Sequence, residues 1–303
     1  MMFFLGMMGS LLQAEPTYVR GQELPAYNVN LFHASIDGKQ VFLNEESTIL
    51  YLNRPWARLN IRAQGPALSY IPYERDEVDL VGGFGGFDLV VGYATKKIGK
   101  PLRVAVLVPV YLGANQDNPA ALGDLHLDVK CSVLSRSWDG HGLALSAKVF
   151  APTGPKSSAL SDESVQFGFN VIYDTQKILQ KGTLHLNVGY RTQPETLYEN
   201  FRWGSHMNTG AGISVPVSLN LEQLNIGSDF STGFSGEVMA KTHLERPFST
   251  DSMIAEASFG GWFGGQLNGI ATPILLRAAY VTSLTTTPGS TGFRIIVDGS
   301  YKF

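Results

Sequence analysis

The stretch GTLHLNVGYRT, residues 182–192, alternates without interruption between apolar and polar side chains. Its apolar side chains occupy every second position: Leu184, Leu186, Val188 and Tyr190. The positions between them are polar or glycine: Thr183, His185, Asn187, Gly189 and Arg191. Because successive side chains of a β-strand point to opposite faces, this period of two predicts a strand with one apolar and one polar face.

The same period recurs along most of the chain, interrupted by clusters rich in Gly, Pro, Asn, Asp and Ser that are typical of turns. Together with the distribution of charged and aromatic residues, the pattern predicts an all-β fold: a single antiparallel transmembrane β-barrel of about 12 strands, with about 14 as the alternative. Strands are expected at residues 57–64, 87–94, 102–110, 123–134, 143–150, 165–173, 182–192, 211–219, 238–244, 254–260, 274–280 and 293–303, and a weaker strand within 221–231.

The composition restricts the class of protein. Charged residues make up 16% of the chain, whereas soluble domains typically contain about 25%. The mean hydropathy is only +0.02, and beyond the N-terminus no run approaches the roughly 20 apolar residues that a spanning helix needs. A net charge of −3 provides no overall basic field, so nucleic acid is not an expected partner.

Few residues suggest chemistry. The chain has one cysteine, Cys131, and its six histidines are scattered without the short spacing of metal ligands. The glycine-rich GGFGG at 82–86 is not followed by the Lys-Ser/Thr of a phosphate loop. Asp139 and His141 in SWDGHG could belong to a protease-like rim site, although a turn explains this motif more simply. We expect no cofactor, no metal and no enzymatic activity.

The first fourteen residues, MMFFLGMMGSLLQA, form an apolar run that ends in a small residue. This pattern is typical of a signal peptide cut after Ala14. Residues 15–55 have mixed composition and poor alternation, so we expect an N-terminal arm, or a plug for the barrel lumen. The barrel itself is expected to span 56–303.

The period of two does not show which face points inward. An exported soluble β-sandwich that acts as a binding module would bury the apolar face, whereas a membrane barrel turns it outward. The membrane barrel is favoured because the polar faces carry few charges and because aromatic side chains lie near strand ends, as in the two aromatic girdles of outer-membrane barrels. These are Trp56, Tyr70, Tyr73, Tyr93, Tyr111, Tyr173, Tyr190, Trp203, Trp262, Tyr280 and Tyr301.

The chain finishes on FRIIVDGSYKF, residues 293–303, with a terminal phenylalanine. This strand resembles the C-terminal signature that the barrel-assembly machinery reads in bacterial outer-membrane proteins. That resemblance assigns an assembly signal to Ile295, Val297, Tyr301 and Phe303.

A wider resemblance rests on NVNLFHASIDGKQVFL, ALGDLHLDVKCSVLSR, LHLNVGYRTQ, FRWGSHMNTGAGISVPVS and TTTPGSTGFRIIVDGSYKF. These stretches are similar to the barrel part of deltaproteobacterial OmpA-family or porin-like outer-membrane proteins. Many members of that family carry a peptidoglycan-binding domain after the barrel, but the resemblance covers the barrel part, so cell-wall anchoring is not expected here. The resemblance implies a location in the outer membrane of a Gram-negative bacterium.

If the apolar face meets lipid, the ionisable side chains of the other face line the lumen. The expected lumen-lining residues are Arg58, Arg62, Arg103, His126, Asp128, Lys130, Lys148, Arg191, Lys241, Arg277, Arg294 and Asp298. Their positive excess predicts a porin-like or structural barrel that allows at most passive diffusion of small solutes, with weak anion preference. Two readings stay open: the charges pair and fill a closed interior, or the barrel transports hydrophobic solutes, to which Val90, Leu107 and Ile172 on the lumen face point.

The expected partners are outer-membrane lipid and, during biogenesis, the barrel-assembly machinery. Small side chains on the apolar face are compatible with a homo-oligomer because they permit close contact between barrels: Ala57, Ala147, Ala211 and Ala278.

Overall fold

The computed structural model describes residues 34–36, 39–65, 68–70, 78–81, 84–97, 99–112, 120–135, 140–154, 161, 164–176, 181–198, 201–217, 231–244, 253–265, 274–285 and 292–303. The predicted signal peptide, the first part of the arm and all but the last residue of the weak strand predicted within 221–231 lie outside these residues. Asp139 also lies outside them.

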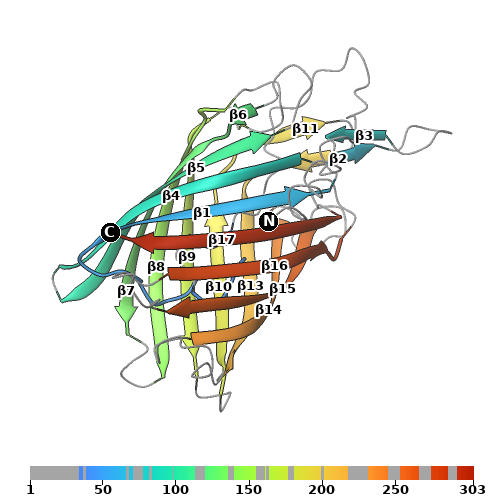
Figure 1. Ribbon diagram of the computed structural model, residues 1–303. Helices are drawn as coiled ribbons and strands as arrows, with labels where there is room; N and C mark the ends of the chain where they lie inside the picture. The colour runs from blue at the N-terminus through green and yellow to red at the C-terminus, as the bar shows by residue number, and fades with distance from the viewer. Residues whose placement is uncertain are drawn as a thin grey trace.

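Twelve antiparallel strands close into one barrel (Figure 1). Each strand pairs with the next, β1 pairs with β17, and the ring is completed by β1–β4 and β4–β5. The prediction of twelve strands is therefore confirmed, and the soluble-sandwich alternative is wrong because one sheet closes on itself. The strands are β1 (Pro55–Gln64), β4 (Phe84–Lys97), β5 (Lys100–Leu112), β7 (Leu125–Leu134), β8 (His141–Ala151), β9 (Gln166–Thr175), β10 (Thr183–Arg191), β13 (His206–Val217), β14 (Ser231–His243), β15 (Met253–Gly265), β16 (Ile274–Ser283) and β17 (Phe293–Lys302).

Five short strands that the sequence did not predict lie at one end of the barrel, which we call the loop end (Figure 1). They are β2 (Leu68–Tyr70), β3 (Val78–Val81), β6 (Ala120–Leu122), β11 (Thr196–Tyr198) and β12 (Phe201–Trp203). The pairs β2–β3 and β11–β12 form separate hairpins within long connections. The C-terminus and the tight turn between β4 and β5 lie at the opposite end, which we call the turn end.

The two faces of each strand point as a barrel in lipid requires. On β7, Leu127 is 42% exposed, whereas its neighbours Asp128 and Lys130 are fully buried. On β10, Val188 is 53% exposed, whereas Arg191 is 5% exposed. The apolar side chains therefore cover the outer surface, and the charged side chains fill the interior.

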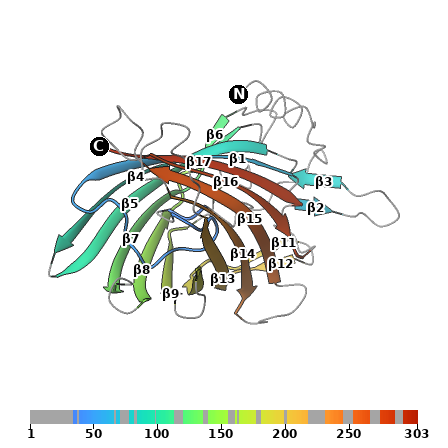
Figure 2. The same cartoon turned by 60° about the horizontal axis from the view of Figure 1, so that its bottom comes forward.

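Residues 34–36 and 39–51, which we call the lumen segment, lie inside the barrel (Figure 2). Val41 and Phe42 are fully buried there, and Asn53 and Arg54 then lead into β1. The segment forms no strand apart from an isolated bridge between Leu52 and Ala94 just beyond it. Its residues therefore fill space that strand side chains leave in the interior.

Three of the aromatic residues predicted for the outer girdles point inward instead: Trp56, Tyr111 and Trp262 are buried. Glycines on neighbouring strands make room for the two tryptophan rings. Trp56 is paired with Gly92 and Trp262 with Gly233. A Cβ atom at Gly92 would lie 2.5 Å from the Trp56 ring, and one at Gly233 would lie 2.3 Å from the Trp262 ring. Tyr93, Tyr190, Tyr280 and Tyr301 do lie on the outer surface.

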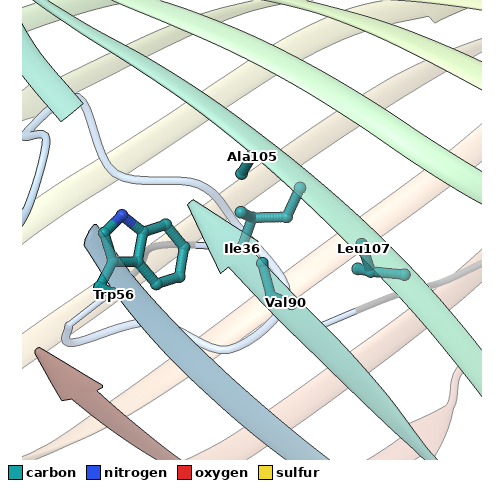
Figure 3. Packing of buried hydrophobic residues seen from close by; sticks show 5 residues of the cluster. All are labelled: Ile36, Trp56, Val90, Ala105 and Leu107. Atoms are coloured by element: carbon teal, nitrogen blue, oxygen red, sulfur yellow. The ribbon is translucent and has the colours of Figure 1, made fainter. Parts of the chain in front are cut away.

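Trp56 also helps to hold the lumen segment. Ile36 of the segment packs into a buried cluster with Trp56 of β1, Val90 of β4, and Ala105 and Leu107 of β5 (Figure 3). A second cluster joins Ala34 and Leu43 of the segment to Val281 and Ile296 of the wall. Apolar contacts thus hold the segment against the wall at two places.

Among the described residues, no helix has the length and apolar character of a transmembrane span.

Closure of the sheet predicts resistance to detergent. We expect unheated protein in SDS to migrate faster on a gel than boiled protein, because a closed barrel leaves no strand edge from which unfolding can start. Equal mobility with and without boiling would contradict the closed barrel.

Candidate functional site

The interior of the barrel is the candidate site, and the structure places every predicted lumen residue there. All are buried except Lys148, whose side chain is 18% exposed. These residues come from strands on all sides of the ring: Arg58, Arg62, Arg103, His126, Asp128, Lys130, Lys148, Arg191, Lys241, Arg277, Arg294 and Asp298.

Many of these charges pair with a side chain on a nearby strand. Arg62 lies 2.6 Å from Asp88, and Arg277 lies 2.7 Å from Asp298. Arg103 pairs with Asp128 and Arg294 with Glu256, and all these side chains are nearly inaccessible to water. Because an unpaired buried charge is costly, loss of one partner from such a pair typically costs about 3–5 kcal/mol. The ion pairs therefore lock neighbouring strands together and neutralise much of the lumen.

The carboxylate of Glu237 on β14 is the main hydrogen-bond acceptor for the lumen segment. Its Oε1 accepts a hydrogen bond from the backbone N–H of Phe42 (2.6 Å), and its Oε2 accepts bonds from the backbone N–H groups of Leu43 (2.9 Å) and Asn44 (2.8 Å). The Asn44 side-chain amide donates a further bond to Oε2 (3.1 Å). Successive backbone amides that converge on one carboxylate form an anion nest. Here the barrel wall supplies the anion.

Other wall residues satisfy the rest of the segment's backbone. Asn187 accepts from the N–H of Glu45 and donates to its carbonyl, both at 3.1 Å. The Lys130 ammonium donates to the carbonyl of Glu46 at 2.7 Å, and the Arg277 guanidinium donates to the carbonyl of Val41. Buried peptide groups need such partners, so the segment can cross the interior without secondary structure.

A chain of side chains joins two points of the segment. Ser214 Oγ donates to Gln40 Oε1 (3.0 Å) and lies 2.8 Å from His185 Nε2. His185 Nδ1 lies 2.9 Å from Asp174, whose other oxygen accepts from both the N–H and the hydroxyl of Ser47 (2.7 Å each).

The order of Ser214, His185 and Asp174 is that of a hydrolase triad. All three side chains are fully buried, however, and they are not among the residues that line the cavity of about 100 Å³ beside the segment. We therefore interpret the chain as an anchor that ties Gln40 and Ser47 to the wall.

A cavity of about 100 Å³ remains beside the segment. Lys148, Arg191 and Lys241 are its cations, and Glu45 is its carboxylate. Many of its wall residues belong to the last or first few positions of strands at the loop end, such as Phe150 of β8 and Gly168 of β9. The lumen thus has an interior filled largely by the segment and a small cation-rich space near one mouth. Among the described residues, no group of three or more His, Cys, Asp or Glu side chains could hold a metal ion.

Sequence reasoning assigned the wall side chains to the lumen but did not predict which ones hold the segment. Glu237, Asp174 and Asn187 sit at inward positions of alternating strands, so their facing could be read from the pattern. Their partners are backbone atoms about 130–195 residues away in sequence. Backbone atoms carry no sequence signal of their own.

Comparisons with known proteins find similarity in fold but not in sequence. No protein-family model matches the chain, and no curated protein matches it. Among solved structures, an outer-membrane channel from Pseudomonas putida F1 matches with a TM-score of 0.55 and 11% identity, over 84% of this chain and 97% of that one. The NanC porin (TM-score 0.44, 9% identity, 81% of this chain and 100% of that one) and LpxR from Salmonella typhimurium (0.43, 12%, 81% and 100%) are also similar. The first likeness shows that the chain has the fold of an outer-membrane β-barrel.

The hydrogen bonds to Glu237 predict that removal of its carboxylate loosens the lumen segment. In a Cys131→Ser background that carries Leu43→Cys, we expect Glu237→Ala to raise the rate of labelling by a water-soluble maleimide at least about tenfold. Loss of the acceptor leaves three buried N–H groups unsatisfied, at about 1–3 kcal/mol each.

The matched control is Asp88→Asn, because Asp88 is a buried carboxylate that accepts a hydrogen bond from Arg62 of the wall. Labelling of the thiol introduced at position 43 should stay slow in the control. Equal rates in the Glu237→Ala protein and its parent would show that Glu237 does not hold the segment.

Proposed function

We propose that the chain is an outer-membrane barrel of a Gram-negative bacterium that allows at most passive diffusion of small solutes, with a weak preference for anions. The observation that carries the proposal is a closed ring of strands with an apolar outer surface and a charged interior. In hydrocarbon, unpaired backbone groups find no partner, so closed barrels can span a bilayer where open sheets cannot. An apolar exterior around a polar interior suits lipid outside and solute inside.

The two ends of the barrel support an orientation. Connections at the turn end run from two residues (98–99) to thirteen (218–230), whereas those at the loop end run from nine (244–252 and 284–292) to nineteen (65–83). Outer-membrane barrels have short periplasmic turns and longer extracellular loops. We place the turn end, with the start of β1 and the C-terminus, in the periplasm. The longer loops and the cavity then face outward.

The filled interior supports slow diffusion rather than a wide pore. The lumen segment is bonded to strands on opposite sides of the ring, including β7, β10, β14 and β16. Wall charges such as Arg277 and Asp298 neutralise one another, so we assign the anion preference to the cations of the cavity. Transport of purely hydrophobic solutes is less well supported, because Val90 and Leu107 pack against Ile36 and the cavity beside them is lined by three cations.

We further propose that the chain is related to deltaproteobacterial OmpA-family barrels, that its first fourteen residues are a signal peptide, and that it forms a homo-oligomer. We also propose that the barrel-assembly machinery recognises Ile295, Val297, Tyr301 and Phe303. Tyr301 and Phe303 are exposed, and their rings meet edge to face at 5.2 Å, which supports a joint recognition surface. We also propose that the barrel is not an enzyme, because Ser214 is covered by the segment.

Conductance across a planar bilayer tests the diffusion step. We expect small channels whose reversal potential in a salt gradient shows preference for chloride over potassium. Removal of residues 34–51 should raise the conductance several-fold, because the segment fills the interior. A cation preference, or equal conductance with and without the segment, would contradict this function.

The lipid-facing surface predicts a second result. Val188→Arg should lower the free energy of unfolding of the barrel in lipid vesicles by about 2–4 kcal/mol if Val188 lies near the midplane, because arginine is costly there. Denaturant titration followed by tryptophan fluorescence measures the loss. The control is Leu284→Arg, because Leu284 is exposed just beyond the end of β16 at the loop end, and its hydrogen bond to Ala255 is donated by the backbone N–H. An equal loss in both variants would argue against burial of Val188 in lipid.

A further inference from the structure

The loop-end cavity has a cationic side whose groups are held in place. The Arg191 guanidinium stacks over the Phe150 ring, 3.7 Å from its centre, and its Nε donates to Gln166 at 2.5 Å. Lys241 of β14 is paired in register with Asn208 of β13, whose buried Oδ1 has no hydrogen-bond partner among the described residues. A positioned guanidinium and a neighbouring ammonium suit a carboxylate group.

Among the described residues that line the cavity, Glu45 is the one carboxylate. Glu45 already bonds Lys148 at 3.2 Å, and it lies 4.0 Å from Arg103 in the wall. Glu45 is therefore shared between two cations, while Lys148, Arg191 and Lys241 all line the same space. The net charge of the lining is positive.

A glycine keeps the space between these cations open. In the strand register Gly168 lies between Lys148 on β8 and Arg191 on β10. A Cβ atom at Gly168 would lie only 3.2 Å from the Phe150 ring. A larger residue would therefore fill the gap between the two cations or push the ring aside.

The remaining lining is apolar, and it comes from both the segment and the wall. Ile36 and Leu43 belong to the segment, whereas Leu107, Phe150 and Met239 belong to strands. Burial of apolar surface against these side chains favours a ligand with an apolar part. A volume of about 100 Å³ limits that part to a compact group.

We infer that this cavity binds small organic monocarboxylates with a compact apolar body, such as an aromatic carboxylate. The inference rests on the proposed function, for which it names the class of solute. The carboxylate lies toward Arg191 and Lys241, and the apolar body packs on Phe150, Met239 and the segment.

Calorimetry on the full-length barrel in detergent tests the inference with three probes. Benzoate should bind, whereas acetate, which lacks the apolar body, and benzyl alcohol, which lacks the charge, should each bind at least about tenfold more weakly, a difference of about 1.4 kcal/mol. Absence of benzoate binding to folded barrel, or equal binding of acetate or benzyl alcohol, overturns the inference. This comparison needs no variant.

Variants locate the site. Lys241→Met keeps the length of the side chain and should weaken benzoate binding at least about fivefold, because one charge contact is lost. Lys302→Met is the matched control: it removes one positive charge near the turn end, outside the cavity, and should leave the affinity unchanged. Unchanged affinity in Lys241→Met, with its heat-dependent gel shift intact, overturns the site.

Conductance of the same preparations distinguishes failure of the carboxylate site from failure of the diffusion function. Anion conductance without benzoate binding rejects only the cavity as a carboxylate site. Benzoate binding without conductance keeps the site and rejects the diffusion function.

Discussion

A charge that leaves bulk water needs a partner, and this requirement organises the whole interior of the barrel. The outer surface is apolar, so polar side chains of the strands have only the lumen to occupy. There they pair between adjacent strands, as Arg62 of β1 pairs with Asp88 of β4 and Arg277 of β16 with Asp298 of β17. Removal of either partner leaves a buried charge. The interior is thus a network in which each buried charge depends on its partners to replace the water it has lost.

The lumen segment belongs to this network as a source of backbone groups. Glu237 has three peptide N–H groups around its carboxylate, and Lys130 and Arg277 have peptide carbonyls. A segment without secondary structure needs acceptors and donors for its own backbone, and the buried charges of the wall need hydrogen-bond partners. Each satisfies the other. This reciprocity explains how the buried segment crosses the interior without pairing as a strand.

The same arrangement limits what the lumen can do. Where segment and wall match, the interior is filled, and the Ser214–His185–Asp174 chain serves as an anchor despite its triad order. Where they do not match, near Arg191 and Lys241, a cation-rich cavity remains. Selectivity would then reside in a few side chains at one mouth rather than in the many paired charges below them.

The period of two in stretches such as 182–192 was enough to predict the twelve barrel strands and to assign residues such as Lys130 to the polar face and Val188 to the apolar face, because strand geometry alone sends neighbouring side chains to opposite faces. Other features depended on contacts between distant parts of the chain. Trp56 points inward because Gly92 on the adjacent strand leaves room for its ring. Glu237 holds the lumen segment because the fold brings residues 42–44, about 195 positions away in sequence, next to its carboxylate. Only the closed tertiary structure, in which such positions meet, could decide which polar groups pair and where space remains for a solute.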